Sequence, residues 1–359
     1  MRFSFAAGIA VATCIAGAAC ADAVSDAKAG QDALNRNDNA GAVALFSRAI
    51  DSHGLSQDGQ ESAYVERATA FMAMRQFDLA LADLDLAQSI SPDDPDAKTM
   101  RAKIPPTATL DQTSAARRGA TLYGRGDYDG ALAALNRAID LKPRDDYSLY
   151  ERGLTWLAKP DYDRALADFN AVMQIKPTWG TLEERGNAWR GRGNYAQAIA
   201  DYNNALQMNS SAAAVYFDRG QAYALQRDSS SAINDFNRAL QLAPNVEAYL
   251  YARCEIRSAA SVDLDRALAD CDKTLQINPD SAADFDARAF AHFKRGEFDL
   301  AIGDANEALR RDARRASALF VRGLAETRSG KGNGAADIRT AQSMDSHVGD
   351  YYAKWGVRF

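Results

Sequence analysis

Apolar and small residues recur along this chain in two helical patterns that repeat about every 34 residues. In the first pattern a small residue lies midway along the apolar stripe. These small residues are Gly30, Ala68, Gly119, Gly153, Gly186, Gly220, Cys254, Ala289 and Gly323. In most repeats large apolar residues stand four positions before it and three after it, a spacing that places them on one helical face. The pattern predicts a first helix whose small residue lets another helix approach closely.

The second pattern starts about twelve residues later with an alanine, continues with a bulky and then a small residue, and closes at a proline in most repeats. The alanines are Ala80, Ala131, Ala165, Ala198, Ala232, Ala267 and Ala301. Small residues facing small residues permit tight antiparallel packing, and proline ends a helix. The sequence therefore predicts a stack of helix pairs rather than one globular core.

Two opposite charges also recur in phase with the repeat. An arginine precedes the small residue at Arg67, Arg118, Arg152, Arg185, Arg219, Arg253, Arg288 and Arg322. An aspartate recurs in the second helix at Asp83, Asp168, Asp201, Asp235, Asp270, Asp304 and Asp337. Since a guanidinium can hold a carboxylate with two hydrogen bonds, we expect a ladder of ion pairs along the stack.

The order of these residues resembles the tetratricopeptide repeat, with nine units between residues 25 and 359. The first helix carries a large apolar, a small and an aromatic residue, and the second carries alanine, an aromatic, alanine and a closing proline. The resemblance, to an exported bacterial member of the family, implies an all-α, right-handed superhelical solenoid of antiparallel helix pairs. In the last three units Arg257, His292 and Glu326 replace the aromatic residue, so these units should pack less tightly or use other partners.

The repeats divide the chain. Residues 22–104 hold two full units and a half unit, 105–112 form a linker that begins with Pro105 and Pro106, and 113–347 hold seven further units. The linker is either a hinge or a bulge in a continuous stack. Residues 348–359, the tail, are rich in aromatic side chains and are expected to cap the last apolar face, with partner binding as the alternative.

Residues 1–21 read as a secretory signal peptide, because one arginine precedes an apolar stretch of small residues that ends in Ala19, Cys20 and Ala21. Cleavage after Ala21 would give a periplasmic or secreted protein. A lipoprotein anchored through Cys20 is the alternative. The remaining sequence has no long apolar run, so we expect no transmembrane segment in the mature chain.

The net charge limits the classes of partner. A net charge of −6 with a pI of about 5.3 argues against nucleic-acid binding.

The cysteines and other reactive residues limit the possible chemistry. Cys254 and Cys271 occupy facing positions in the two helices of one unit, so an exported protein should join them in a disulfide; two buried thiols are the alternative. No phosphate loop, catalytic set or grouped metal ligands can be assembled, so we expect neither an enzyme nor a cofactor or metal.

In the family that the chain resembles, partner proteins bind the concave face, lined by the first helices at three positions before, one after and four after the small residue. The residues expected in such a groove here are Tyr123, Tyr150, Leu154, Leu157, Arg190, Phe217, Tyr251, Phe290, Phe293 and Phe320. The predicted function is a scaffold of the cell envelope or secreted space that holds a peptide or helical segment of a partner protein. The alternative is a structural subunit of an envelope assembly or transport complex that docks through its convex face or its tail.

Overall fold

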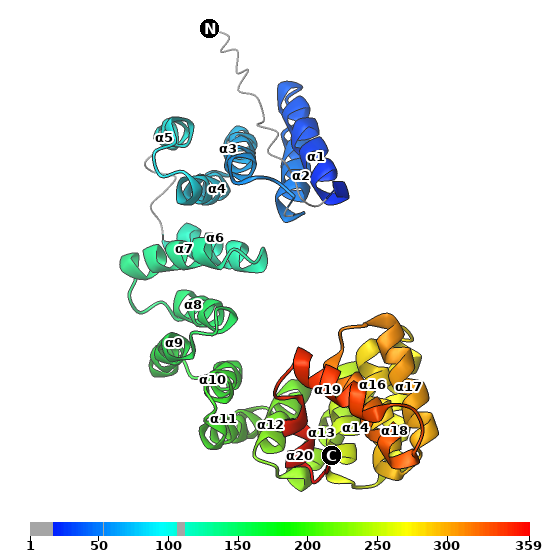
Figure 1. Cartoon of the computed structure of the whole chain (residues 1–359). Helices are drawn as coiled ribbons and strands as arrows, with labels where there is room; N and C mark the ends of the chain where they lie inside the picture. The colour runs from blue at the N-terminus through cyan, green and yellow to red at the C-terminus, as the bar shows by residue number, and fades with distance from the viewer. Residues whose placement is uncertain (1–16, 53, 106–111) are drawn as a thin grey trace. The chain divides into compact units, whose positions relative to one another are not determined.

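A computed structural model describes residues 17–52, 54–105 and 112–359, and every regular element in these ranges is an α-helix. The expected all-α solenoid is confirmed, because consecutive helices pack as antiparallel pairs (Figure 1). The chain divides into two compact units, Met1–Pro177 and Thr178–Phe359, and each is described by itself.

The N-terminal unit contains the following helices: α1 (Gly17–Asn35), α2 (Asn39–Asp51), α3 (Gln57–Ala73), α4 (Phe77–Ile90), α5 (Pro95–Ala102), α6 (Gln112–Gly124), α7 (Tyr128–Leu141), α8 (Asp146–Ala158) and α9 (Tyr162–Ile175). The C-terminal unit contains α10 (Trp179–Gly191), α11 (Tyr195–Met208), α12 (Ala213–Leu225), α13 (Ser229–Leu242), α14 (Glu247–Ala260), α15 (Leu264–Ile277), α16 (Ala282–Arg295), α17 (Phe298–Arg311), α18 (Ala316–Ser329), α19 (Gly334–Met344) and α20 (Val348–Lys354).

The beginning of the chain bears on the predicted signal peptide. Residues 1–16 lie outside the described residues, and α1 begins at Gly17, so the cleavage after Ala21 stays a prediction. None of the described helices combines the length and the apolar character that crossing a membrane requires.

The break in the repeat period lies within the N-terminal unit. Residues 106–111 of the predicted linker lie outside the described residues. Helix α5 packs against α3 and α4. Across the break, Leu86 of α4 shares a buried cluster with Leu122 of α6 and Leu135 of α7. Arg118 of α6 also forms an ion pair with Asp85 of α4. Packing and charge therefore join the helices on both sides of the break.

The small residues of the first helices lie where the second helix places its largest side chain. A Cβ added to Gly153 of α8 would lie 2.6 Å from the ring of Phe169, which is fully buried on α9. Gly186 and Gly220 meet the rings of Tyr202 and Phe236 at the same distance. Absence of a side chain at these positions is what lets an aromatic ring fill the centre of each pair.

The predicted ion-pair ladder is present. Arg152 of α8 donates from Nε and Nη2 to the two carboxylate oxygens of Asp168 on α9, at 2.9 and 2.6 Å. The same two-bond pairing joins Arg67 to Asp83, Arg185 to Asp201, Arg219 to Asp235, Arg253 to Asp270, Arg288 to Asp304 and Arg322 to Asp337. Each pair clamps the first helix of a repeat to the second.

Most of these arginines make a third bond, which the repeat pattern did not predict. Nη1 of Arg219 donates to Asn203 of the preceding repeat at 2.6 Å, and Nη1 of Arg253 donates to Asn237 at 2.7 Å. Arg152, Arg288 and Arg322 reach Asn136, Asp272 and Asn306 in the same way. The guanidinium therefore fixes each repeat to its predecessor as well as closing its own helix pair.

In the C-terminal unit, polar contacts and a disulfide are found where other repeats have aromatic packing. Arg257 is buried and donates to Asp270 at 2.8 Å, so the residue that replaces an aromatic side chain joins the ladder. His292 lies 2.7 Å from a carboxylate oxygen of Glu297. Cys254 of α14 and Cys271 of α15 form a disulfide, with their Cα atoms 5.7 Å apart.

Candidate functional site

The first helices of the N-terminal unit carry half-buried apolar side chains at the predicted groove positions. Tyr123 lies on α6, and Tyr150, Leu154 and Leu157 lie on α8, which contacts α6. The Tyr150 ring is 5.9 Å from that of Phe169. Tyr150 thus takes part in packing within its helix pair, while part of each of the four side chains stays on the surface.

The first helices α10 and α12, at the start of the C-terminal unit, carry a polar network. Nη2 of Arg190 on α10 donates to Asp218 of α12 at 3.3 Å and to Asn187 at 3.2 Å. The Tyr202 hydroxyl donates to the same Asn187 oxygen at 2.7 Å, and Asn187 donates to Glu184 at 3.2 Å. One cation faces the two carboxylates of this network, which leaves it negatively charged.

Burial raises the pKa of three carboxyl groups of α10 and α12, which are Glu183, Glu184 and Asp218. Burial, and then repulsion from Asp218 and Glu184, raises the pKa of Glu183 to about 7. Burial raises the pKa of Asp218 to about 6 despite the attraction of Arg190. A cation brought by a partner would favour the charged form of these groups.

Replacing Glu183 by glutamine should stabilise the C-terminal unit more at pH 8 than at pH 5. The pKa of Glu183 is raised on folding, so the stability that its protonated form contributes is present below the ordinary value of 4.5 and is lost as the pH rises through about 7. Glutamine stays neutral at both pH values and avoids that loss. Thermal unfolding of both proteins at the two pH values measures the difference.

The matched control for this pH dependence is Glu307→Gln. Glu307 lies on α17, and hydrogen bonds from Arg310 and Arg311 lower its pKa, so glutamine there should give no gain at pH 8. An effect of Glu183→Gln that is the same at pH 5 and pH 8 would contradict the assignment.

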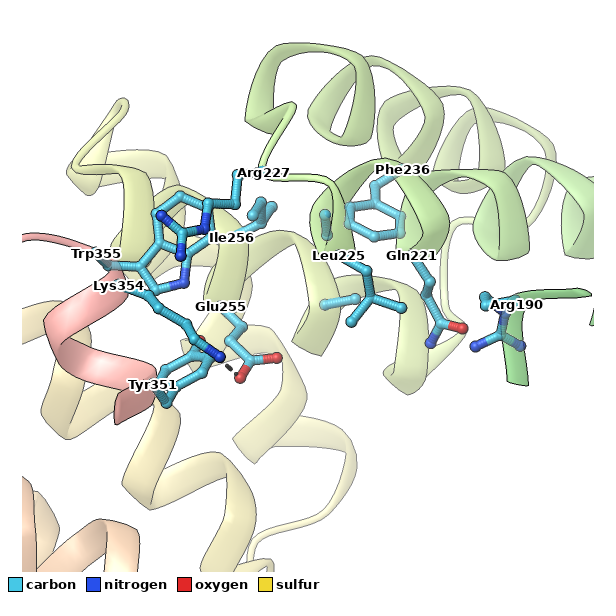
Figure 2. A pocket seen from close by; sticks show the side chains of 12 residues that line it. Arg190, Gln221, Leu225, Arg227, Phe236, Glu255, Ile256, Tyr351, Lys354 and Trp355 are labelled. Carbon is cyan, nitrogen blue, oxygen red and sulfur yellow. Dashed lines mark hydrogen bonds between the residues drawn. The ribbon is translucent and has the colours of Figure 1, made fainter. Parts of the chain in front are cut away.

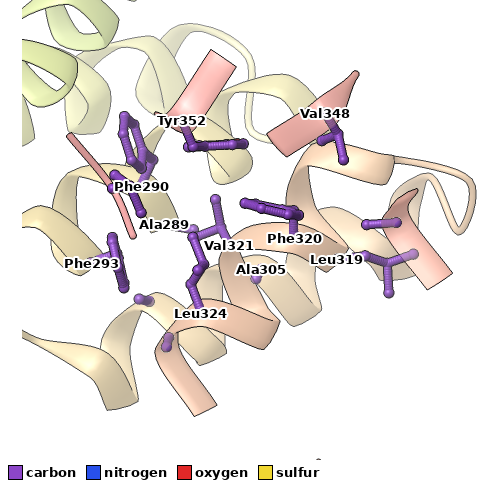
Figure 3. Packing of buried hydrophobic residues seen from close by; sticks show 14 of the residues in the cluster. Ala289, Phe290, Phe293, Ala305, Leu319, Phe320, Val321, Leu324, Val348 and Tyr352 are labelled. Atoms are coloured by element: carbon purple, nitrogen blue, oxygen red, sulfur yellow. The ribbon is translucent and has the colours of Figure 1, made fainter. Parts of the chain in front are cut away.

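Beyond α19 the chain turns back, and the tail lies on the first-helix face of the last pairs (Figures 1 and 3). The Tyr352 ring of α20 is 5.0 Å from the ring of Phe290 on α16 and 5.0 Å from that of Phe320 on α18. Trp355 packs against the cluster that contains Ile256 of α14. The tail therefore covers part of the face on which an open groove was expected.

This arrangement buries three of the predicted groove residues. Phe293 and Phe320 have exposed fractions of 8% and 0%, so the expectation that they line an open groove is wrong. Phe290 is 4% exposed and borders a small hollow beside the tail. Phe290 and Phe320 contact Tyr352 of the tail, whereas Phe293 packs against Phe298 of α17 at 5.9 Å. Their positions lie on the expected face, but the chain itself buries them.

An open hollow of about 410 Å³ remains beside the tail (Figure 2). Its apolar side chains come from α12, α13, α14 and the tail, and its rim is polar. The apolar residues are Ala224, Leu225, Phe236, Ala252, Ile256 and Trp355; the polar ones are Arg190, Gln221, Arg227, Glu255, Tyr351 and Lys354. The Tyr351 hydroxyl donates to Glu255 at 3.0 Å. An apolar hollow with a few polar groups at its edge is the usual form of a binding site.

Comparison with known families decides the family of the chain. Sequence models described as tetratricopeptide repeat match residues 28–95, 117–178 and 287–338, which together are half of the chain, and residues 213–246; one described as TPR repeat matches 186–226. The chain belongs to the tetratricopeptide repeat (TPR) family. Membership indicates a scaffold for protein–protein interaction, with a protein as the partner.

Solved structures agree with the fold of this TPR protein. A tetratricopeptide repeat protein from Parabacteroides merdae is 17% identical, with 68% of this chain and 99% of that chain covered and a TM-score of 0.55. The APC/C hetero-tetramer Cut9–Hcn1 gives a match that is 14% identical, covers 93% of this chain and 76% of that chain, and has a TM-score of 0.52. No curated protein matches the sequence. At these identities the likeness concerns the fold alone.

The hollow of the TPR protein includes Arg190 from the predicted groove, and Gln221 at the expected position one after the small residue Gly220. Tyr251 and Phe290 line a second hollow of about 250 Å³ that also borders Tyr351. Phe217 is half-buried, with its ring 4.7 Å from that of Tyr249.

Some residues that line the hollow were not predicted from the sequence, because they do not occupy the positions three before, one after or four after the small residue. Leu225 and Ile256 fall five and two positions after the small residue of their helices, and Trp355 belongs to the tail. The spacing of Val348, Tyr352 and Trp355 gives the tail an apolar helical face. The tail was expected to cap the last apolar face, but the contact of Trp355 with the Ile256 cluster of α14 was not expected.

Proposed function

We propose that this TPR protein is a binding scaffold that holds a helical or extended segment of a partner protein on the first-helix face of its C-terminal unit, without catalysis. The open hollow beside α12 and α14 is the observation that carries the proposal. Leu225 at its edge is 52% exposed, which makes it a large apolar side chain available for contact. Burial of a partner's apolar side chain there would supply the main favourable free energy.

The charges around the hollow define the partner segment further. Asp218 and Glu184 lie on the side of Arg190, within the negatively charged network. The segment that fits would place an apolar side chain in the hollow and a lysine or arginine toward these carboxylates. Charge complementarity of this kind adds specificity and speeds association more than it adds affinity.

Docking through the outer surface is the competing function. Other large apolar side chains of the C-terminal unit are exposed one at a time near the ends of second helices, as at Met208, Ile277 and Met344. Single exposed apolar residues are ordinary on soluble proteins. The hollow therefore favours the first-helix face.

The proposal includes export of the protein to the periplasm or the outside of the cell. Its support is the apolar leader of residues 1–21 together with the Cys254–Cys271 disulfide, since disulfides persist in oxidising compartments. N-terminal sequencing of the protein from the envelope fraction tests it. A mature chain that starts at Asp22 is expected, a lipid-modified Cys20 would support the lipoprotein, and an intact Met1 would refute export.

A pair of charge insertions tests the binding face. Leu225→Glu places a carboxylate at the edge of the hollow, whereas Leu300→Glu changes an equally exposed leucine, 56% exposed, on the second helix α17. Affinity for the partner, isolated with the natural protein and then purified, should fall about tenfold or more for Leu225→Glu and stay unchanged for Leu300→Glu. The reverse result would assign binding to the outer surface.

A further inference from the structure

The tail binds the rest of the C-terminal unit as a short amphipathic peptide would. Val348, Tyr352 and Val357 are buried, whereas Lys354 and Arg358 are exposed, so one face of the segment makes the contact. Figure 3 shows Tyr352 lying over Phe290 and Phe320. Recognition of a helix by its apolar face in a groove has this form.

Few polar bonds hold the tail in place. Lys294 donates to the main-chain oxygen of Trp355 at 3.3 Å, and Arg328 donates to that of Arg358 at 2.9 Å. Tyr351 donates to Glu255. Helix α20 has seven residues, and the three residues 345–347 connect it to α19. The tail is thus a short tethered segment held mainly by its aromatic and aliphatic side chains.

The tail fills its groove incompletely. Hollows of about 410 and 250 Å³ both border Tyr351, whose exposed fraction is 37%. Well-packed interfaces leave few such spaces, because each contact that a space removes loses dispersion energy. A longer helix with bulkier side chains would bury more of this surface than α20 does.

Two carboxyl groups, Asp286 and Glu255, lie beneath the tail, and one oxygen of Asp286 lacks a donor. Asp286 is 5% exposed; one of its oxygens accepts from Arg315 at 2.6 Å and from Ser317, and the other, Oδ1, is buried without a hydrogen-bond partner. The bond that Glu255 receives comes from the neutral Tyr351 hydroxyl. A buried acceptor without a donor destabilises its surroundings, and a cation at this place would satisfy it.

We propose that the tail is an internal occupant of a docking groove on α14, α16 and α18, and that a partner's amphipathic helix displaces it. The partner helix carries an aromatic side chain in the place of Tyr352 and a lysine or arginine in the place of Tyr351, facing Glu255 and Asp286. This inference rests on the proposed function, because it specifies the partner of the same face and how access to it is controlled.

Competition by the tail itself tests the displacement. A specific protease site inserted between Ser346 and His347 allows the folded full chain to be cut, so that the tail remains bound without a tether. A fluorescent peptide of residues 347–359 is then added to cut and uncut protein. Because a short tether gives the tail an effective concentration in the millimolar range, the uncut protein should bind the peptide about a hundredfold more weakly.

Two variants of the uncut chain sharpen the measurement. Tyr352→Ala removes the ring between Phe290 and Phe320 and should increase peptide binding, whereas Ala353→Ser on the exposed side should leave it unchanged. Failure of the peptide to exchange into folded cut protein, or equal binding by cut and uncut protein, would overturn the inference.

A second peptide tests the charge. With Tyr351→Lys it should bind cut protein about threefold or more tightly than the natural peptide, and Glu255→Gln in the protein should abolish that gain. Equal binding of the two peptides to cut protein would refute the lysine or arginine proposed for the partner helix. If the peptide does not exchange but Leu225→Glu still weakens partner binding, only this inference is rejected. If the peptide exchanges but Leu225→Glu leaves partner binding unchanged, only the proposed function is rejected.

Discussion

Replacing Asp83 by alanine is expected to lower the free energy of unfolding of the N-terminal unit by about 3–5 kcal/mol. Arg67 donates two 2.7 Å hydrogen bonds to Asp83, and the exposed fractions of the two side chains are 3% and 0%. Removing the carboxylate leaves a buried guanidinium without its counter-charge. Urea unfolding followed by circular dichroism, with hydrogen exchange of α3 and α4 as the local probe, measures the loss.

The control for Asp83 is the pair of Arg48 with Asp26. It has the same chemistry, but Arg48 is 64% exposed, so Asp26→Ala should cause little change. Changing both buried partners, with Arg67→Met and Asp83→Leu, should restore much of the stability, since no unpaired charge is left. If Asp83→Ala and Asp26→Ala lower the free energy of unfolding equally, burial is not the reason that the Arg67–Asp83 pair stabilises the fold.

Loss of the disulfide is expected to destabilise the C-terminal unit by about 3 kcal/mol. Cys254 and Cys271 are 17 residues apart in sequence and join α14 to α15, so the bridge restricts the unfolded chain at this repeat. Both positions are buried, which makes them slow to react with a reductant while the protein is folded. Urea unfolding of the oxidised protein with and without a phosphine reductant measures the change.

The double variant Cys254→Ala and Cys271→Ala is the control for reduction. It should unfold at the same urea concentration with and without reductant, near the midpoint of the reduced natural protein. Free thiols in protein isolated from its natural cells, or identical midpoints for the oxidised and reduced natural protein, would contradict a stabilising bridge.

The features that the sequence made predictable are those in which one repeat resembles the next. Arg152 and Asp168 face each other because each occupies a fixed place in its helix, and the same holds for Gly153 beneath Phe169. A fixed place in a repeat specifies contacts within the helix pair. The same reasoning placed Cys254 opposite Cys271, where the structure forms the bridge.

The features that could not be predicted from the sequence depend on contacts of a repeat with the tail or with the preceding repeat. Phe290 and Phe320 lie on the expected face, but the periodicity contains no information on the tail that covers them. The third bond of Arg219 to Asn203 depends on how one pair stacks on the previous one. The hollow is lined by Leu225 of α12 and Ile256 of α14 together with Trp355 of the tail, a segment far along the chain that the repeat does not include.

Site-specific photo-crosslinking tests the central claim most directly, that a partner lies on the first-helix face of the C-terminal unit. A photoreactive amino acid replaces Leu225 at the hollow in one protein and Leu300 on α17 in another, and both are irradiated in cells that make the natural protein. The proposed function predicts one distinct crosslinked partner from position 225 and none of it from position 300. The same partner crosslinked from position 300 alone would contradict it.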